Sequence, residues 1–126
     1  MSKEILNTTK APAPIGPYNQ AVKANGFLFV SGQVAINPES NELVTDNITN
    51  ETHQVMKNLE AILTNAGISF GKVVKTTIFL SDMDLFAQVN EIYAQYFTSD
   101  FPARETVAVR TLPKGVNVEI SVIALV

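Results

Sequence analysis

Apolar residues alternate with other residues near the end of the chain, over Asn117–Val126. Five apolar residues share one parity there: Val116, Val118, Ile120, Val122 and Ala124. This period of two is typical of a strand with one buried face. A second strand-like run, Glu105–Thr111, comes before it, and Leu112–Gly115 forms a turn in which Pro113 can preset φ and Gly115 can supply a positive φ. The pattern predicts a C-terminal hairpin.

Two charged residues interrupt this hairpin pattern. Glu119 falls in mid-strand on the parity opposite to the apolar face, and Arg104 stands where the first strand begins. If the hairpin closes over the turn, Arg104 lies opposite Ile123 and Glu119 lies opposite Ala108. Four residues along a strand span roughly 13 Å. Arg104 and Glu119 of one chain are therefore not expected to touch, and a shared site would need two chains.

Two longer segments have the apolar period of helices. Ile48–Asn65 has an apolar stripe that continues to Ala66, with Asn47 or Thr49 as N-cap and Gly67 after its end. The apolar stripe consists of Val55, Met56, Leu59, Ile62 and Leu63. The residues expected to face solvent are Gln54, Lys57, Asn58, Glu60 and Asn65. Leu85–Phe97 is the second predicted helix, capped by Asp82 or Asp84, with a stripe of Phe86, Val89, Ile92, Tyr93, Tyr96 and Phe97.

The remaining segments predict further strands. These are Ile5–Leu6, Tyr18–Ala24, Phe27–Val34 and Val73–Ser81, and Asn25-Gly26 between the second and third is a type I′ hairpin signal. We therefore expect one α+β domain over residues 1–126, a mixed sheet with two helices on one face. The open face is expected to carry Thr106, Ala108, Arg110, Asn117, Glu119, Ser121 and Ile123. Such a half-apolar face favours oligomerisation.

The composition excludes several kinds of site. The chain has 126 residues and a formal net charge of −3, and its Lys and Arg residues are scattered, which argues against a nucleic-acid partner. It has no cysteine and one histidine, so thiolate catalysis and the usual Cys or His metal sites are not expected. No apolar run approaches the ~18 residues that a membrane span needs. We expect a cytoplasmic protein that needs no metal or cofactor.

Arg104 and Glu119 are the candidates for chemistry. A guanidinium can bind a carboxylate bidentately, and a carboxylate can hold a water and move a proton. The competing interpretations are an ion pair of Arg104 with Glu105 or Asp100, and a solvent-facing strand position for Glu119.

Four other residues are weaker candidates. Tyr18 and Ser31 offer hydroxyl groups, and Gly32 allows a close backbone approach. Asn90 lies beside the stripe of the second helix. Strand packing or turn chemistry for the first three, and an ordinary helix surface for Asn90, are the simpler interpretations. His53 is expected to be a solvated residue of the first helix.

Several segments together resemble the Rid family, also called the YjgF or L-PSP endoribonuclease family. They run nearly from end to end: Ile15–Val22, Phe29–Pro38, Val73–Phe97, Phe101–Val109 and Leu112–Val126. They contain the GPY, SGQ, PAR and LPKGVNVEI motifs.

The resemblance implies a chorismate-mutase-like α+β fold and a homotrimer whose sheets form a central barrel, with sites between subunits. It also implies RidA-type hydrolysis of 2-imino acids, such as 2-iminobutanoate and 2-iminopropanoate, to 2-keto acids and ammonia. By motif, Arg104 would bind the substrate carboxylate and Glu119 would activate water.

The same resemblance implies that Tyr18, Ser31 and Gly32 line the cleft and that Asn90 closes it from the neighbouring subunit. Thr106 stands where many relatives have cysteine, two residues after the PAR arginine. It keeps a small polar group there but removes thiol chemistry.

The sequence is compatible with other functions as well. A ligand-sensing trimer with little turnover, binding a small keto or amino acid, would also need Arg104, whereas Glu119 favours the enzyme. An endoribonuclease comes with the older family name, but the acidic charge and the single histidine do not favour it. A chaperone-like role is not addressed by the sequence.

Overall fold

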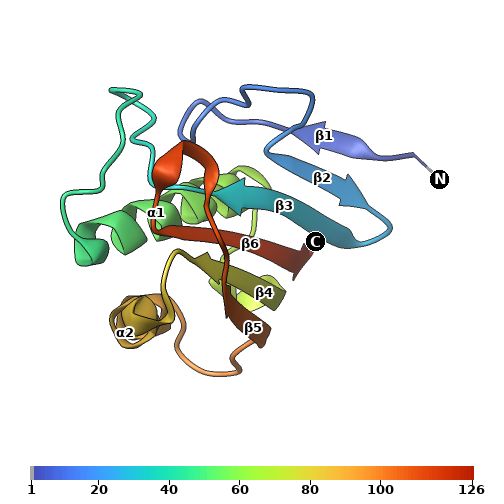
Figure 1. Cartoon of the computed structure of the whole chain (residues 1–126). Coiled ribbons are helices and arrows are strands. Elements are labelled where there is room, and N and C mark those ends of the chain that lie inside the picture. Colours follow the sequence, from blue (N-terminus) through green and yellow to red (C-terminus); the bar gives the residue numbers. More distant parts are fainter. Residues whose placement is uncertain (1) are drawn as a thin grey trace.

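The computed structural model describes residues 2–126 and consists of one sheet and two helices (Figure 1). The strands are β1 (Glu4–Leu6), β2 (Ala21–Ala24), β3 (Phe27–Gln33), β4 (Val73–Leu80), β5 (Ala103–Ala108) and β6 (Val118–Leu125). The helices are α1 (Ile48–Asn65) and α2 (Phe86–Ala94), and short 3₁₀ turns cover Phe70–Lys72, Met83–Leu85 and Pro113–Gly115. The expected α+β fold is confirmed.

The sheet has the strand order β1-β2-β3-β6-β4-β5. Only β4 and β5 are paired in parallel, across the crossover through α2, and every other pair is antiparallel. The predicted pairing of the last two strands is therefore wrong, because β4 lies between β5 and β6 (Figure 1). The connection between them passes the end of β4, where Val109 N donates to Leu80 O and Ser81 N donates to Asn117 O.

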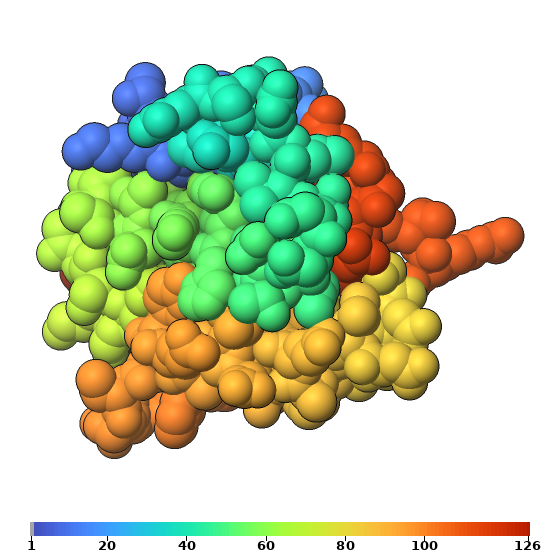
Figure 2. Space-filling view, turned by 90° about the vertical axis from the view of Figure 1, so that its left-hand side faces the viewer, coloured from blue at the N-terminus to red at the C-terminus, as the bar shows by residue number. Residues whose placement is uncertain are grey.

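Both helices cover the same face of the sheet, and Figure 2 shows α1 (green) beside α2 (yellow to orange). The bounds of α1 match the prediction, Asn47 caps it by accepting from Asn50 N, and Gly67 has φ +79°. The prediction that Asn58 faces solvent is wrong, because Asn58 is buried. α2 is shorter than expected, mainly because it ends at Ala94 and not at Phe97.

The first hairpin has the turn that its sequence predicts. Asn25 and Gly26 have φ of 53° and 85°, and both values are positive as a type I′ turn requires. The strand before the turn begins at Ala21 and not at Tyr18. Tyr18 instead belongs to the loop that follows Pro17, which leaves its side chain about half exposed.

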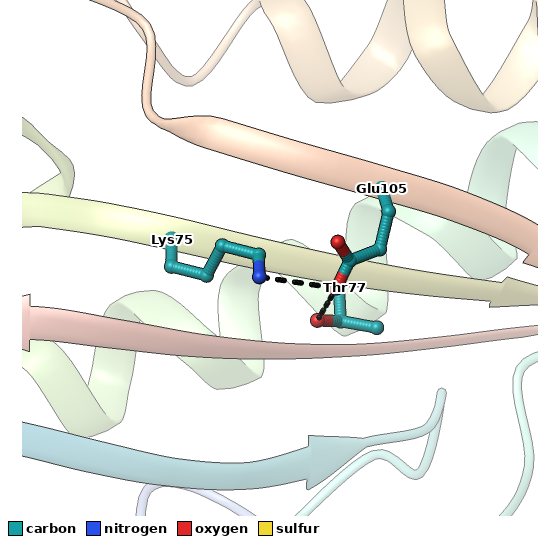
Figure 3. A network of polar contacts seen from close by, with 3 residues as sticks. All are labelled: Lys75, Thr77 and Glu105. Atoms are coloured by element: carbon teal, nitrogen blue, oxygen red, sulfur yellow. Dashed lines mark hydrogen bonds and ion pairs between the residues drawn. The ribbon is translucent and has the colours of Figure 1, made fainter.

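The open face of the sheet carries a polar contact between β4 and β5 (Figure 3). Lys75 Nζ lies 3.1 Å from Glu105 Oε2, and Thr77 Oγ1 donates to the same oxygen at 3.4 Å. The register places Glu119, Ser121 and Ile123 on this face as expected.

The other expected members of the open face do not belong to it. Thr106 and Ala108 pair with the buried residues Ile78 and Leu80, so they lie on the helix side. Arg110 follows the end of β5, and Asn117 precedes β6. Within residues 2–126, no helix has the length and apolar character of a membrane span.

Candidate functional site

Arg104 lies on β5 with its side chain against α2. Its Nη1 donates to Asn90 Oδ1 at 2.7 Å, and its guanidinium carbon lies 5.0 Å from the Tyr93 ring centroid and 5.6 Å from that of Phe86. Cation–π contacts hold the plane of the guanidinium while leaving its edge free for acceptors. The helix therefore orients a cation whose remaining N–H groups can receive a carboxylate.

The ion pairs that would make Arg104 an ordinary surface residue are not formed. Glu105 points to the opposite face of the sheet and pairs with Lys75 (Figure 3). That contact is the only ion pair among residues 2–126, so Asp100 does not pair with Arg104 either. The absence of a carboxylate partner for Arg104 in the described part of the chain favours the anion-binding interpretation.

Thr106 is the second polar residue of this part of the molecule. It lies two positions after Arg104 on the same strand, and its Oγ1 is buried without a hydrogen-bond partner in residues 2–126. A buried hydroxyl without a partner costs free energy, and such a group in a native structure calls for an explanation. We call Arg104, Asn90 and Thr106 the arginine half-site. Arg104 and Asn90 line a cavity of about 400 Å³.

Glu119 projects from the middle of β6 into a different cavity, of about 430 Å³. Burial raises the pKa of its carboxyl group above the ordinary value of 4.5. Tyr18, Ser31 and Gly32 line the same cavity. We call these three residues and Glu119 the glutamate half-site. Its other lining residues are Pro12, Ala13, Ile15, Gln20, Gln33, Val34, Ile36, Pro113 and Lys114.

Gly32 leaves the space that the Glu119 carboxylate occupies. A Cβ at position 32 would lie 2.5 Å from Glu119 Oε2 and 2.8 Å from its Cδ. Its neighbour Ser31 is fixed by backbone contacts, because Ser31 Oγ donates to Asn19 O at 2.6 Å and Ser31 N donates to Gln20 O at 2.9 Å. The SGQ segment thus places Gly32, which has no side chain, directly against the carboxylate of Glu119.

The two half-sites do not meet within one chain. Arg104 pairs with Thr76 of β4, whereas Glu119 pairs with Phe79 of the same strand. Two strand spacings and three residues of offset separate their Cα atoms by about 14 Å. Their side chains also lie on opposite faces of the sheet, since Arg104 contacts α2. The separation expected from the sequence remains, although the hairpin used to estimate it does not exist.

Buried polar side chains hold the walls of the glutamate half-site, and the sequence patterns did not reveal them. Gln20 Nε2 donates to the carbonyls of Thr8, Ala11 and Pro12, and Asn58 Nδ2 donates to those of Val34 and Ile36. A polar residue among apolar ones resembles a surface position until its backbone partners are known.

His53 also differs from its prediction. It is half-buried, and its Nδ1 lies 2.8 Å from the Tyr96 hydroxyl, so it is a packed residue between the helices and not a solvated one. It lies outside both cavities described above.

Gly32→Ala is expected to displace Glu119 and to lower any turnover that depends on it by about 100-fold, because small misplacements of a reacting group have effects of that size. Gly71→Ala is the matched control, since a Cβ there meets nothing closer than Ser69 Oγ at 3.9 Å. Turnover and circular dichroism of both variants give the comparison. Shortening the carboxylate in Gly32→Ala/Glu119→Asp should restore part of the lost rate, and an unaffected Gly32→Ala variant would contradict the close approach.

The protein is thus a small α+β protein, with two helices on one face of a six-stranded sheet and one half-site on each face. The model of the family described as Endoribonuclease L-PSP matches residues 8–126. The chain belongs to this family, which is the one that its motifs resemble.

Known relatives cover almost the whole chain. A RutC family protein of Pyrococcus horikoshii is 50% identical over 122 residues, which cover 97% of each chain. A mouse protein named 2-iminobutanoate/2-iminopropanoate deaminase is 48% identical over 123 residues, covering 98% of this chain and 91% of its own. The crystal structure of a Rid family protein from Yersinia pestis, titled as of unknown function, has a TM-score of 0.97 at 51% identity and covers 99% of this chain and 100% of its own.

Proposed function

We propose that this protein hydrolyses reactive 2-imino acids, such as 2-iminobutanoate and 2-iminopropanoate, to 2-keto acids and ammonia. The observation that carries the proposal is the pair of half-sites: a guanidinium that has no carboxylate partner among residues 2–126, and a partly buried carboxylate with a raised pKa. An α-imino acid needs one group of each kind, because it carries a carboxylate next to an electrophilic carbon. The name of the mouse relative supports the same reaction.

We further propose that the complete site forms between subunits of a homotrimer. The half-sites lie on opposite faces of the sheet, so only a second chain can bring them together. The open face supports such an assembly, since Phe29 and Val107 on it are 46% and 43% exposed. Packing of three such faces would give a central barrel of sheets and would place Glu119 of one chain near Arg104 and Asn90 of the next.

In the proposed reaction, Arg104 binds the substrate carboxylate, with Thr106 as a second donor. Glu119 takes a proton from water, and the water oxygen forms a bond to C2 while the C=N electron pair moves to nitrogen. Glu119 then returns the proton to the nitrogen of the carbinolamine. Glu119 next takes the proton of the carbinolamine hydroxyl and passes it to the amino nitrogen, so that the C–N bond breaks as the oxygen forms the C=O bond, and ammonia leaves. One carboxylate acts first as base and then as acid, and the steps involve no change of oxidation state.

The proposal assigns the remaining residues to the shape of the site. Tyr18 and Ser31 border the water and the nitrogen, and Gly32 keeps room for the Glu119 carboxylate. We propose a cytoplasmic location, where imines formed by other amino-acid enzymes are met. The chain's net charge of −3 and scattered basic residues do not favour RNA as a substrate, despite the description of the family.

A coupled assay tests the proposal directly. Threonine dehydratase converts threonine to 2-iminobutanoate, and semicarbazide competes for the imine while 2-ketobutyrate formation is followed. The protein is expected to increase the fraction that becomes 2-ketobutyrate. If it binds 2-ketobutyrate by calorimetry but does not compete with semicarbazide, the alternative of a ligand-sensing trimer replaces the enzyme.

A further inference from the structure

Glu51 is a buried carboxylate that no part of the proposed reaction uses. It lies in the first turn of α1, and 0% of its surface is exposed. A carboxylate is rarely buried unless hydrogen-bond donors surround it, because its desolvation is costly. Its partners therefore indicate what it does.

Within residues 2–126, the Glu51 side chain accepts three hydrogen bonds, which come from Asn117, just before β6, and from Val118, the first residue of β6. Glu51 Oε2 accepts from Asn117 N at 2.7 Å and from Val118 N at 3.1 Å. Glu51 Oε1 accepts from Asn117 Nδ2 at 2.9 Å. The oxygens of Glu51 face N–H groups that can only donate, so each of the three contacts joins a donor with an acceptor.

Asn117 is held from its other side by the end of β4. Ser81 N donates to Asn117 O at 3.0 Å, and Ser81 Oγ donates to Asn117 Oδ1 at 2.9 Å. Asn117 thus joins α1 to the ends of two strands. We call Glu51, Ser81 and Asn117 the strand clamp. It fixes the backbone two residues before Glu119.

The position of the Glu119 carboxylate is limited on one side by Gly32. Its carboxylate lies directly against Gly32, where a Cβ would lie 2.5 Å from Oε2, and its side chain extends from β6 into the cavity. Its placement therefore depends on the backbone of β6. We infer that Glu51 is a positioning residue for Glu119, acting through the strand clamp. The inference rests on the proposed function, in which Glu119 activates water.

The clamp can be broken and rebuilt by substitution. Glu51→Leu removes both acceptor oxygens from the clamp. Glu51→Gln/Asn117→Asp exchanges the polarity of the pair: the amide oxygen accepts from the two backbone N–H groups, and its NH₂ donates to the new carboxylate, which still accepts from Ser81. Glu60→Leu is the matched control, because Glu60 is an exposed carboxylate of the same helix.

Steady-state kinetics in the coupled assay should separate positioning from general stability. Glu51→Leu is expected to lower kcat by about 100-fold, with KM within about threefold, because Arg104 still binds the substrate carboxylate. The polarity-exchanged double variant is expected to recover kcat to within about fivefold of wild type. If Glu51→Leu does not fold, Asn117→Asp replaces it. This substitution breaks the clamp by placing a second carboxylate against that of Glu51, and it opens no cavity.

Two NMR measurements decide the inference independently of turnover. In the broken clamp, the amides of Asn117 and Val118 should exchange faster, and the pKa of Glu119 should fall toward its ordinary value as the carboxylate reaches water. Both should return in the double variant. Unchanged kcat and unchanged Glu119 titration in folded Glu51→Leu would overturn the inference. An inactive wild type with the expected NMR changes would refute the proposed reaction but retain the positioning role.

Discussion

Glu119→Gln is expected to lower kcat for imine hydrolysis by about 1,000-fold, the middle of the range for losing a general acid–base group. Glutamine keeps the size of the side chain but cannot take a proton from water. The KM is expected to change little, because the carboxylate of the substrate is bound by Arg104. Steady-state kinetics of the coupled reaction measure both constants.

The dependence of the wild-type rate on pH tests the role of Glu119 independently. The attack step needs ionised Glu119, and burial raises its pKa above 4.5. The rate should therefore rise with pH through this elevated pKa and level off above it, and Glu119→Gln should abolish this limb. Glu105→Gln is the control, since Glu105 is an exposed carboxylate on the same face of the sheet. A Glu119→Gln variant with nearly normal kcat would remove Glu119 from the mechanism.

Arg104→Ala is expected to reduce kcat/KM by about 1,000-fold, mainly through KM. Two charge-assisted hydrogen bonds to a carboxylate contribute together about 3–6 kcal/mol. Arg104→Lys should lose only part of this, because lysine keeps the charge but not the forked geometry. Kinetics and direct titration with 2-ketobutyrate measure the effect.

The control for this prediction is Arg110→Ala. Arg110 is an exposed arginine just beyond β5, and its removal makes the net charge of −3 more negative by the same amount as removal of Arg104. Equal losses in the two variants would mean that general electrostatic attraction, and not binding at Arg104, accounts for the effect.

The parts of the fold that depend on nearby residues could be predicted from the sequence. The bounds of α1 followed from an apolar stripe between Asn47 and Gly67, and the Asn25-Gly26 turn followed from the need for two positive φ values. The pairing of β5 could not be predicted in this way. A short turn before β6 suggested a hairpin, but the crossover through α2 had already placed β5 beside β4, whose other edge pairs with β6.

The same distinction applies to the site. Arg104 and Glu119 stood out because each interrupts a strand pattern with a charge. Glu51 did not stand out, because a glutamate in the first turn of a helix is ordinary. Its role depends on Asn117, 66 residues away, and on burial that only the folded chain shows. Likewise, Gly32 suggested a close approach, but not that the approaching group is Glu119.

The central claim is that one chain's Arg104 and another chain's Glu119 form each site, and co-expression of Arg104→Ala with Glu119→Gln tests it most directly. In a cyclic trimer, every mixed assembly contains one site with both residues intact, so random mixing should restore about a quarter of wild-type activity. Glu119→Gln co-expressed with the double variant is the control and should restore none. Recovery in the first mixture alone is the predicted result. Mixed trimers with no more activity than either single variant would contradict the shared site.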